Sequence, residues 1–334
     1  MLQKLRLTVL STVCSLQAMD SSVRLKALRS FFVGGEATRL SGLPVQYRSM
    51  VLNGAPREVN PNGVHTHGQM YVQHFELEAP LHPHPVLLWH GGGMTGSTWE
   101  STPDGRPGWL WRFLQAGYSV YVSDAVERGR SSWAMFPQIF KENPVFRTRE
   151  EGWKTFRMGL QYTEDPSSRH VFIGQRFPVE FFDDFTRHWV PRWPGHEELI
   201  LSGYERLVTQ IGDCIVVGHS QGAGFAIETA RRLPKPIRAV IALEPGGMPQ
   251  AVPTSEMPPH LVVWGDHIEK AGTHWTTYRA QADAYLKTSK DLLPATVLDL
   301  PMAGISGNSH FPMMDLNSDA VFHQVHVWMK ANGL

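Results

Sequence analysis

Residues 218–222 read Gly218-His219-Ser220-Gln221-Gly222 and follow directly on an apolar run, Cys214-Ile215-Val216-Val217. A helix-forming segment comes next and stops at Pro234. Apolar β-branched residues favour a strand and a proline ends a helix, so this part of the chain predicts a strand, a sharp turn and a helix. The two glycines let strand and helix approach closely, which leaves the serine hydroxyl exposed at the edge of a sheet. The pattern therefore predicts that Ser220 is a nucleophile.

Apolar runs of the same kind recur along the chain and alternate with helix-like segments. The predicted strands cover residues 45–52, 70–77, 86–89, 119–123, 214–217, 239–243, 261–264 and 295–300, and a closing helix covers 319–330. Strands that alternate with helices indicate a mostly parallel central sheet flanked by helices. The predicted fold class is therefore α/β.

One segment, about 131–203, is far longer than the single crossover helix needed between the fourth and fifth of these strands. It is rich in phenylalanine and tryptophan. Long excursions in compact domains are usually lids or other functional elements. We expect this aromatic-rich insertion to form a cap over the active site. The alternative is a helical excursion whose rings merely pack on the sheet.

Length and charge limit the classes of protein to which the chain can belong. The chain has 334 residues, with 31 basic and 31 acidic side chains and a formal net charge of zero. This length suits one α/β domain with insertions, and no basic run suggests nucleic-acid binding. The two cysteines, Cys14 and Cys214, do not suffice for a disulfide framework.

The N-terminal region, residues 1–40, is predicted to be an extension to a domain over residues 41–334. Residues 1–18 have the charge and the diluted apolar core of a weak signal peptide. The alternative is an ordinary helix that continues through residues 23–28. The protein would be secreted or periplasmic in the first case and cytoplasmic in the second. The stretch is too short and too polar to span a bilayer.

A glycine-rich turn, His90-Gly91-Gly92-Gly93, follows the third predicted strand. Backbone N–H groups at such a turn can hold the negative charge that develops on oxygen during acyl transfer. Gly92 or Gly93 would supply one donor of this oxyanion hole, and Gln221, directly after Ser220, would supply the other. A phosphate-binding loop is disfavoured because no Gly-Lys-Ser/Thr follows.

A serine hydroxyl needs a positioned base, which is expected late in the chain, after the last strand. His310 lies in the loop between that strand and the closing helix. His323 and His326 fall inside the helix, whereas His267 and His274 come one strand too early. His310 is therefore the predicted base.

Two carboxylates compete to orient this histidine. Glu244 stands at the end of the apolar strand 239–243, where a carboxylate is costly to bury without a partner. In most serine hydrolases with this order of motifs, the acid stands three residues past a glycine. Asp266 stands only one residue past Gly265 and is therefore out of register with that position. Glu244 is therefore the predicted acid, and Asp266 is the alternative. If Glu244 is not the acid, its expected role is to form a salt bridge.

Two histidine pairs raise the question of a metal site. His65 and His67 flank a threonine, and His82 and His84 flank a proline. Neither pair has a third ligand at a suitable spacing, so we expect exposed loops, no metal and no cofactor.

With these motifs in this order, the chain from about residue 45 onward resembles the α/β-hydrolase superfamily. Residues 124–131 look like a further loop of that superfamily, with Arg130 in place of a glycine. More narrowly, the run from His90 to Arg106 resembles a small group of bacterial esterases, the esterase 713-like group. That resemblance implies a glutamate after the sixth strand and an exported location. The group has cysteines where this chain has Gly92 and Gly93.

The expected function is hydrolysis of carboxylic esters through an acyl-enzyme on Ser220. The same groups could cleave amides, lactones or carbon–carbon bonds, and a non-catalytic ligand-binding homologue is the alternative from another class. The expected substrate is a small apolar or aromatic ester. A homodimer is one option for the assembly of the protein.

Overall fold

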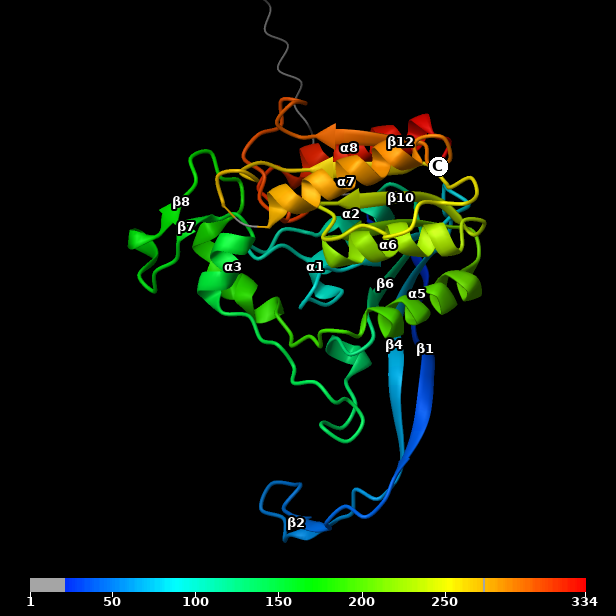
Figure 1. The fold of residues 1–334 in the computed structure, drawn as a ribbon, viewed down its shortest axis with the longest axis vertical. Helices are drawn as coiled ribbons and strands as arrows, with labels where there is room; N and C mark the ends of the chain where they lie inside the picture. The colour runs from blue at the N-terminus through cyan, green and yellow to red at the C-terminus, as the bar shows by residue number, and fades with distance from the viewer. Residues whose placement is uncertain (1–21, 273) are drawn as a thin grey trace, which may run out of the picture.

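An eight-stranded sheet forms the centre of the protein (Figure 1). The computed structural model describes residues 22–272 and 274–334. In order across the sheet, the strands are β1 (Leu25–Leu40), β4 (Gly63–Leu77), β6 (Val120–Asp124), β5 (Val86–Trp89), β9 (Cys214–His219), β10 (Ile237–Leu243), β11 (His260–Trp264) and β12 (Ala295–Asp299). β1 and β6 pair with β4 in antiparallel fashion, and the other neighbouring pairs are parallel. The prediction of a mostly parallel sheet is confirmed.

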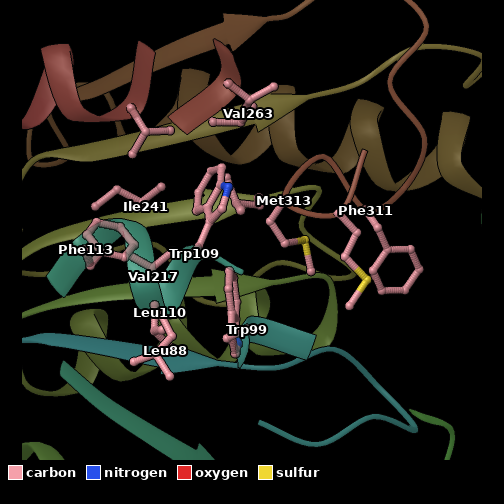
Figure 2. Close-up of a cluster of buried hydrophobic side chains, with 14 of the residues drawn as sticks. Leu88, Trp99, Trp109, Leu110, Phe113, Val217, Ile241, Val263, Phe311 and Met313 are labelled. Carbon is pink, nitrogen blue, oxygen red and sulfur yellow. The ribbon is translucent and has the colours of Figure 1, made fainter. Parts of the chain in front are cut away.

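Helices cover both faces of the sheet because successive strand residues point to opposite faces. Leu87 is buried in one core and its neighbour Leu88 in the other. The first face carries α5 (Glu197–Ile211), α6 (Gln221–Arg232) and α7 (Trp275–Ser289), and the second carries α1 (Ser97–Glu100), α2 (Trp109–Gln115) and α8 (Ser318–Ala331). Figure 2 shows the second core, where Trp109 of α2 lies over strand residues such as Val217. The sheet is thus enclosed, and the loops at the carboxyl ends of its parallel strands are left to form a site.

The N-terminal region differs from the sequence prediction. Residues 25–40 form β1 rather than continuing a helix from 23–28. Within β1 only Val33 is buried, and the other residues are exposed or half-buried. The strand therefore has no apolar periodicity, and its pairing with β4 stabilises it instead. The division predicted after residue 40 therefore cuts across one β-hairpin of the main sheet. The signal peptide predicted for residues 1–18 lies outside the described residues, and within those residues no helix is long and apolar enough to span a bilayer.

The strand predicted over 45–52 is much shorter in the structure. It is reduced to β2 (Gln46–Arg48), which pairs with β3 (Arg57–Val59) apart from the main sheet. Asn53 adopts a φ of 57° in an Asn-Gly turn that ends the apolar run. Figure 1 shows β2 at the far end of an arm formed by β1 and β4.

The chain between β6 and β9 contains the long insertion expected from the sequence. Its elements are short: η1 (Gly129–Ser131), α3 (Arg149–Thr155), β7 (Gly159–Gln161), η2 (Pro166–Ser168), β8 (His170–Val171), η3 (Val179–Phe181), α4 (Phe182–Phe185) and η4 (Thr186–His188). α5 begins at Glu197 and packs on the sheet, so the boundary predicted at residue 203 falls inside a helix of the main fold. The rings of the insertion pack largely with one another and with the second core, as do Trp153 and Phe182, whose centroids lie 4.9 Å apart. The aromatic content therefore builds a folded unit, drawn in green beside the sheet in Figure 1.

Candidate active site

Ser220 occupies a sharp turn between β9 and α6, with φ of 53° and ψ of −119°. Two close backbone approaches make this turn possible. A side-chain carbon added to Gly218 would lie 2.5 Å from the carbonyl oxygen of Gly222, and one added to Gly222 would collide with the carbonyl of His90. The close packing predicted from the two glycines is confirmed.

Three non-glycine residues of this site have positive backbone φ angles. Ser220, Glu244 and Arg157 all have positive φ angles, of 53°, 52° and 63°. Non-glycine residues rarely adopt this region, and such strain persists only where the surrounding structure holds it in place. The three residues therefore occupy positions that the fold enforces.

Glu244 and His310 lie against each other in the interior. Glu244 Oε2 is 3.3 Å from His310 Nδ1, and both residues are fully buried. With the carboxylate ionised, Nδ1 carries the proton and Nε2 presents a lone pair. Nε2 has no hydrogen-bond partner within the described residues, so no bond to Ser220 is formed. A methyl group built on Gly246 would lie 3.2 Å from Ser220 Oγ, which places the serine oxygen on the Gly246 side of the turn.

Asp266, the alternative acid, has other partners. Its carboxylate accepts hydrogen bonds from the backbone N–H groups of His267 at 2.7 Å and Gly307 at 3.1 Å. No hydrogen bond or ion pair joins it to His310 in the described part of the chain. Asp266 therefore holds two loops together, whereas Glu244 contacts the histidine.

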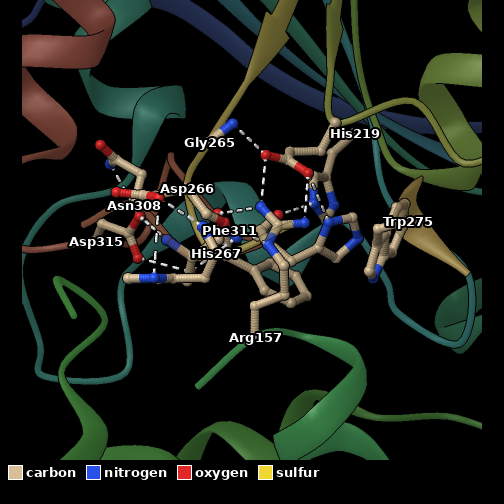
Figure 3. A network of polar contacts seen from close by, with 12 residues as sticks. Arg157, His219, Gly265, Asp266, His267, Trp275, Asn308, Phe311 and Asp315 are labelled. Carbon is tan, nitrogen blue, oxygen red and sulfur yellow. Dashed lines mark hydrogen bonds and ion pairs between the residues drawn. The ribbon is translucent and has the colours of Figure 1, made fainter. Parts of the chain in front are cut away.

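No sequence pattern indicates a role for Arg157, which lies between α3 and β7 in the insertion. Its Nη1 and Nη2 donate to the two carboxylate oxygens of Glu244 at 2.8 and 2.7 Å. Nε donates to the Asp266 carbonyl at 2.7 Å and Nη2 to the Ser309 carbonyl at 3.1 Å. Glu244 also accepts a hydrogen bond from the N–H of Gly265. Figure 3 shows Arg157 at the centre of this network, where it joins the loops that follow β10, β11 and β12.

These contacts set the charges of the pair. Burial alone would raise the pKa of Glu244, but the charge of Arg157 and hydrogen bonds from His310 and Arg157 lower that pKa to about 2. Burial lowers the pKa of His310 to about 4 despite the opposing effect of Glu244. At neutral pH the site therefore holds an ionised glutamate and a neutral histidine.

The loop that carries His310 is fixed by Asp315. The Asp315 carboxylate accepts hydrogen bonds from Ser309 N at 2.8 Å, Ser309 Oγ at 2.7 Å and Asn308 Nδ2 at 2.9 Å. Burial raises the pKa of Asp315 to about 7. The backbone N–H of His310 also donates to the carbonyl of Phe156, at 3.1 Å. The insertion therefore holds the histidine loop as well as the glutamate.

Two of the three predicted oxyanion donors lie together. Gly92 and Gln221 line a pocket with Ser220, whereas Gly93 does not line it and its carbonyl accepts from the Val190 N–H at 2.9 Å. Within the described residues, none of the three N–H groups donates to a backbone carbonyl. Gly92 and Gln221 are thus the better placed pair.

The pocket beside Ser220 has a volume of about 190 Å³. Its other lining residues are Gly246, His274, Trp275, Tyr278 and, from the insertion, Arg147, Glu151, Thr155, Phe156 and Arg192. Phe156 is the one aromatic ring that the described part of the insertion contributes to this lining. A larger groove of about 660 Å³ shares Gln221, Gly246 and Tyr278 with the pocket.

One of the two histidine pairs lies in a strand and not in the loop expected for it. His65 and His67 lie in β4 rather than in an exposed loop, and each has a local partner. His65 Nε2 is 2.8 Å from the Pro61 carbonyl, and His67 Nε2 is 2.8 Å from Thr38 Oγ1. Across residues 22–272 and 274–334, no cluster of three or more histidine, cysteine or acidic side chains is arranged to hold a metal ion.

Comparison with known proteins gives two strong similarities. A solved structure of a novel bacterial esterase matches 94% of this chain and 98% of its own, with 30% sequence identity and a TM-score of 0.80. A probable secreted lipase from a fungus (Fungal sp., strain ATCC 74256) is 30% identical over 194 residues, which cover 54% of this chain and 50% of the lipase. That match spans half the length of the lipase. No protein-family model matches the chain.

Proposed function

Because the chain belongs to the esterases of the α/β-hydrolase superfamily, we propose that it hydrolyses small carboxylic esters through an acyl-enzyme on Ser220. His310 is the general base and Glu244 the acid that orients it. Gly92 and Gln221 supply the N–H groups of the oxyanion hole, with Gly93 as the alternative donor. The observation that carries this assignment is the buried Glu244–His310 contact, which leaves His310 Nε2 without a partner at the same sheet edge as Ser220.

The reaction proceeds in two halves. Ser220 Oγ attacks the ester carbonyl while His310 Nε2 takes its proton, and the oxyanion binds the backbone N–H groups. The protonated histidine then gives its proton to the departing alcohol, leaving an acyl-serine. Water attacks the acyl group with His310 again as base, which releases the acid. Ser220 Oγ and His310 Nε2 are not bonded in the described structure, and hydrogen bonds of this kind often tighten only when substrate binds.

The insertion between β6 and β9 is proposed to act as the cap of this site. Five of the twelve residues that line the pocket come from it, and it also supplies Arg157. Its contribution is chiefly polar, since Phe156 is its single ring there among the described residues.

Labelling with a fluorophosphonate tests the assignment directly. The reagent should modify the intact protein at one residue, because it requires a serine whose proton a nearby base can accept. Peptide mass spectrometry should place the label on Ser220. Absence of labelling, or a label on another serine, would contradict the proposal.

The acid side of the pH profile provides a second test. The base must be neutral, and a histidine with a pKa of about 4 is about 97% neutral at pH 5.5, whereas one with a pKa of about 6.5 is about 9% neutral. We therefore expect kcat/KM for an uncharged ester such as ethyl butyrate to stay near its maximum from pH 8 to 5.5 and to fall toward pH 4. A midpoint near 6.5 would contradict the lowered pKa of His310 in the free enzyme.

A further inference from the structure

The side chain of Arg192 lies across the proposed oxyanion loop. A carbon added to Gly92 would be 3.3 Å from Arg192 Nη1, and one added to Gly93 would be 4.0 Å from its Cδ. The backbone is fixed by a reciprocal pair of hydrogen bonds with Val145, at 3.2 and 2.7 Å. The guanidinium therefore stands in the same pocket as Ser220.

No ion-pair partner of this guanidinium is found among the described residues. Within the described residues Arg192 makes no side-chain hydrogen bond or ion pair, while Arg147 is paired with Glu151 at 2.6 Å. Arg147, Arg192 and Glu151 give the pocket two positive charges and one negative charge. Burial, and then the charge of Arg192, lower the pKa of Arg147 to about 10 although Glu151 opposes this. The pocket therefore has an excess of positive charge that an anion would neutralise.

The size of the pocket limits what that anion is attached to. A volume of about 190 Å³ is below the range of about 300–1,000 Å³ that is usual for small-molecule pockets. The planar guanidinium matches a carboxylate in geometry and in charge. Since Arg192 is beside Gly92, a carboxylate bound there would be only a few atoms from a carbonyl held by the Gly92 N–H. The larger groove that shares Gln221 and Gly246 has room for the other half of the ester.

Given the ester hydrolysis proposed above, we propose that Arg192 binds a carboxylate on the substrate, so that the preferred substrates are small esters with a free carboxylate near the scissile bond. This differs from the apolar or aromatic ester expected from the sequence.

The test compares esters that differ by one carboxylate. Monoethyl succinate carries it in the acyl half and 3-acetoxypropanoate in the alcohol half, and ethyl butyrate is the neutral reference. The wild-type protein should show a higher kcat/KM for one of the two anionic esters than for ethyl butyrate. The measured quantity is the ratio of kcat/KM for the preferred anionic ester to kcat/KM for ethyl butyrate. Arg192→Gln should lower this ratio by about 10- to 100-fold, the usual effect of losing a hydrogen bond to a charged group.

The ratio is measured on one preparation, so any unfolded fraction of the variant cancels. Arg187→Gln is the matched control, because Arg187 is an exposed arginine of the same insertion and should leave the ratio at the wild-type value. No preference for either anionic ester in the wild-type protein would overturn the proposal. An equal loss on charged and neutral esters in Arg192→Gln would also overturn it and would assign Arg192 to oxyanion stabilisation. Failure of the wild-type protein to hydrolyse any of the three esters would count instead against the proposed esterase activity.

Discussion

Replacing Ser220 by alanine is expected to lower kcat for ester hydrolysis by about a million-fold, the usual effect of removing the nucleophile of a catalytic triad. Alanine keeps the β-carbon, and the Ser220 side chain makes no hydrogen bond that holds β9 or α6 in place among the described residues. The fold should therefore survive, with an unchanged circular dichroism spectrum. Turnover of ethyl butyrate, followed by ethanol release, provides the measurement.

Ser168→Ala is the control for this experiment, since Ser168 is an exposed serine in η2 of the insertion. It should retain wild-type kcat. If Ser220→Ala kept substantial turnover, the acyl-enzyme would have to form on another residue, and the elbow would be a structural feature only.

The second large effect concerns the choice between the two acids. Glu244→Gln is expected to lower kcat by about ten-thousand-fold, because an amide does not select the histidine tautomer that presents a lone pair to the serine. Asp266→Asn should lower kcat by less than about tenfold, since the Asp266 side chain bonds backbone N–H groups rather than His310. Rates should be expressed per folded molecule, with the folded fraction of each variant taken from its circular dichroism spectrum.

That correction is needed because Glu244→Gln leaves Arg157 buried without its counter-charge, which typically costs about 3–5 kcal/mol of stability. Glu244→Asp keeps the charge and should recover part of kcat. If Asp266→Asn lowered kcat more than Glu244→Gln, the acid would be Asp266 in the loop after β11. The buried Glu244–His310 contact would then no longer support the assignment.

The sequence predicted the features that short-range patterns encode. β5 was predicted residue for residue, and β9, the turn and α6 were predicted in order, because buried parallel strands are continuous apolar runs and the elbow needs glycine at fixed spacing. β1 was missed for the opposite reason. Its side chains are mostly exposed, and a strand stabilised by pairing with a distant segment carries no apolar signal of its own.

The residues of the site, like the strands, could be predicted only where a local sequence pattern indicates them. A carboxylate at the end of β10 indicated that some partner must exist, and Glu244 was singled out on that basis. No local pattern identifies Arg157 as that partner, because 87 residues separate the two in the chain. The charge of the pocket was missed as well, since Arg147 and Arg192 come from irregular segments whose positions depend on tertiary packing.

The bond between Arg157 and Glu244 also restricts how the protein can move. A hinged lid that swung off the sheet would carry Arg157 with it and leave a buried glutamate unpaired. Breaking such a pair typically costs about 3–5 kcal/mol, so an open form would be populated by between about one molecule in 200 and about one in 5,000. Substrate should therefore reach Ser220 through the existing groove beside Gly246. The backbone amides whose hydrogen bonds this opening would break should exchange about 200- to 5,000-fold more slowly than unprotected amides.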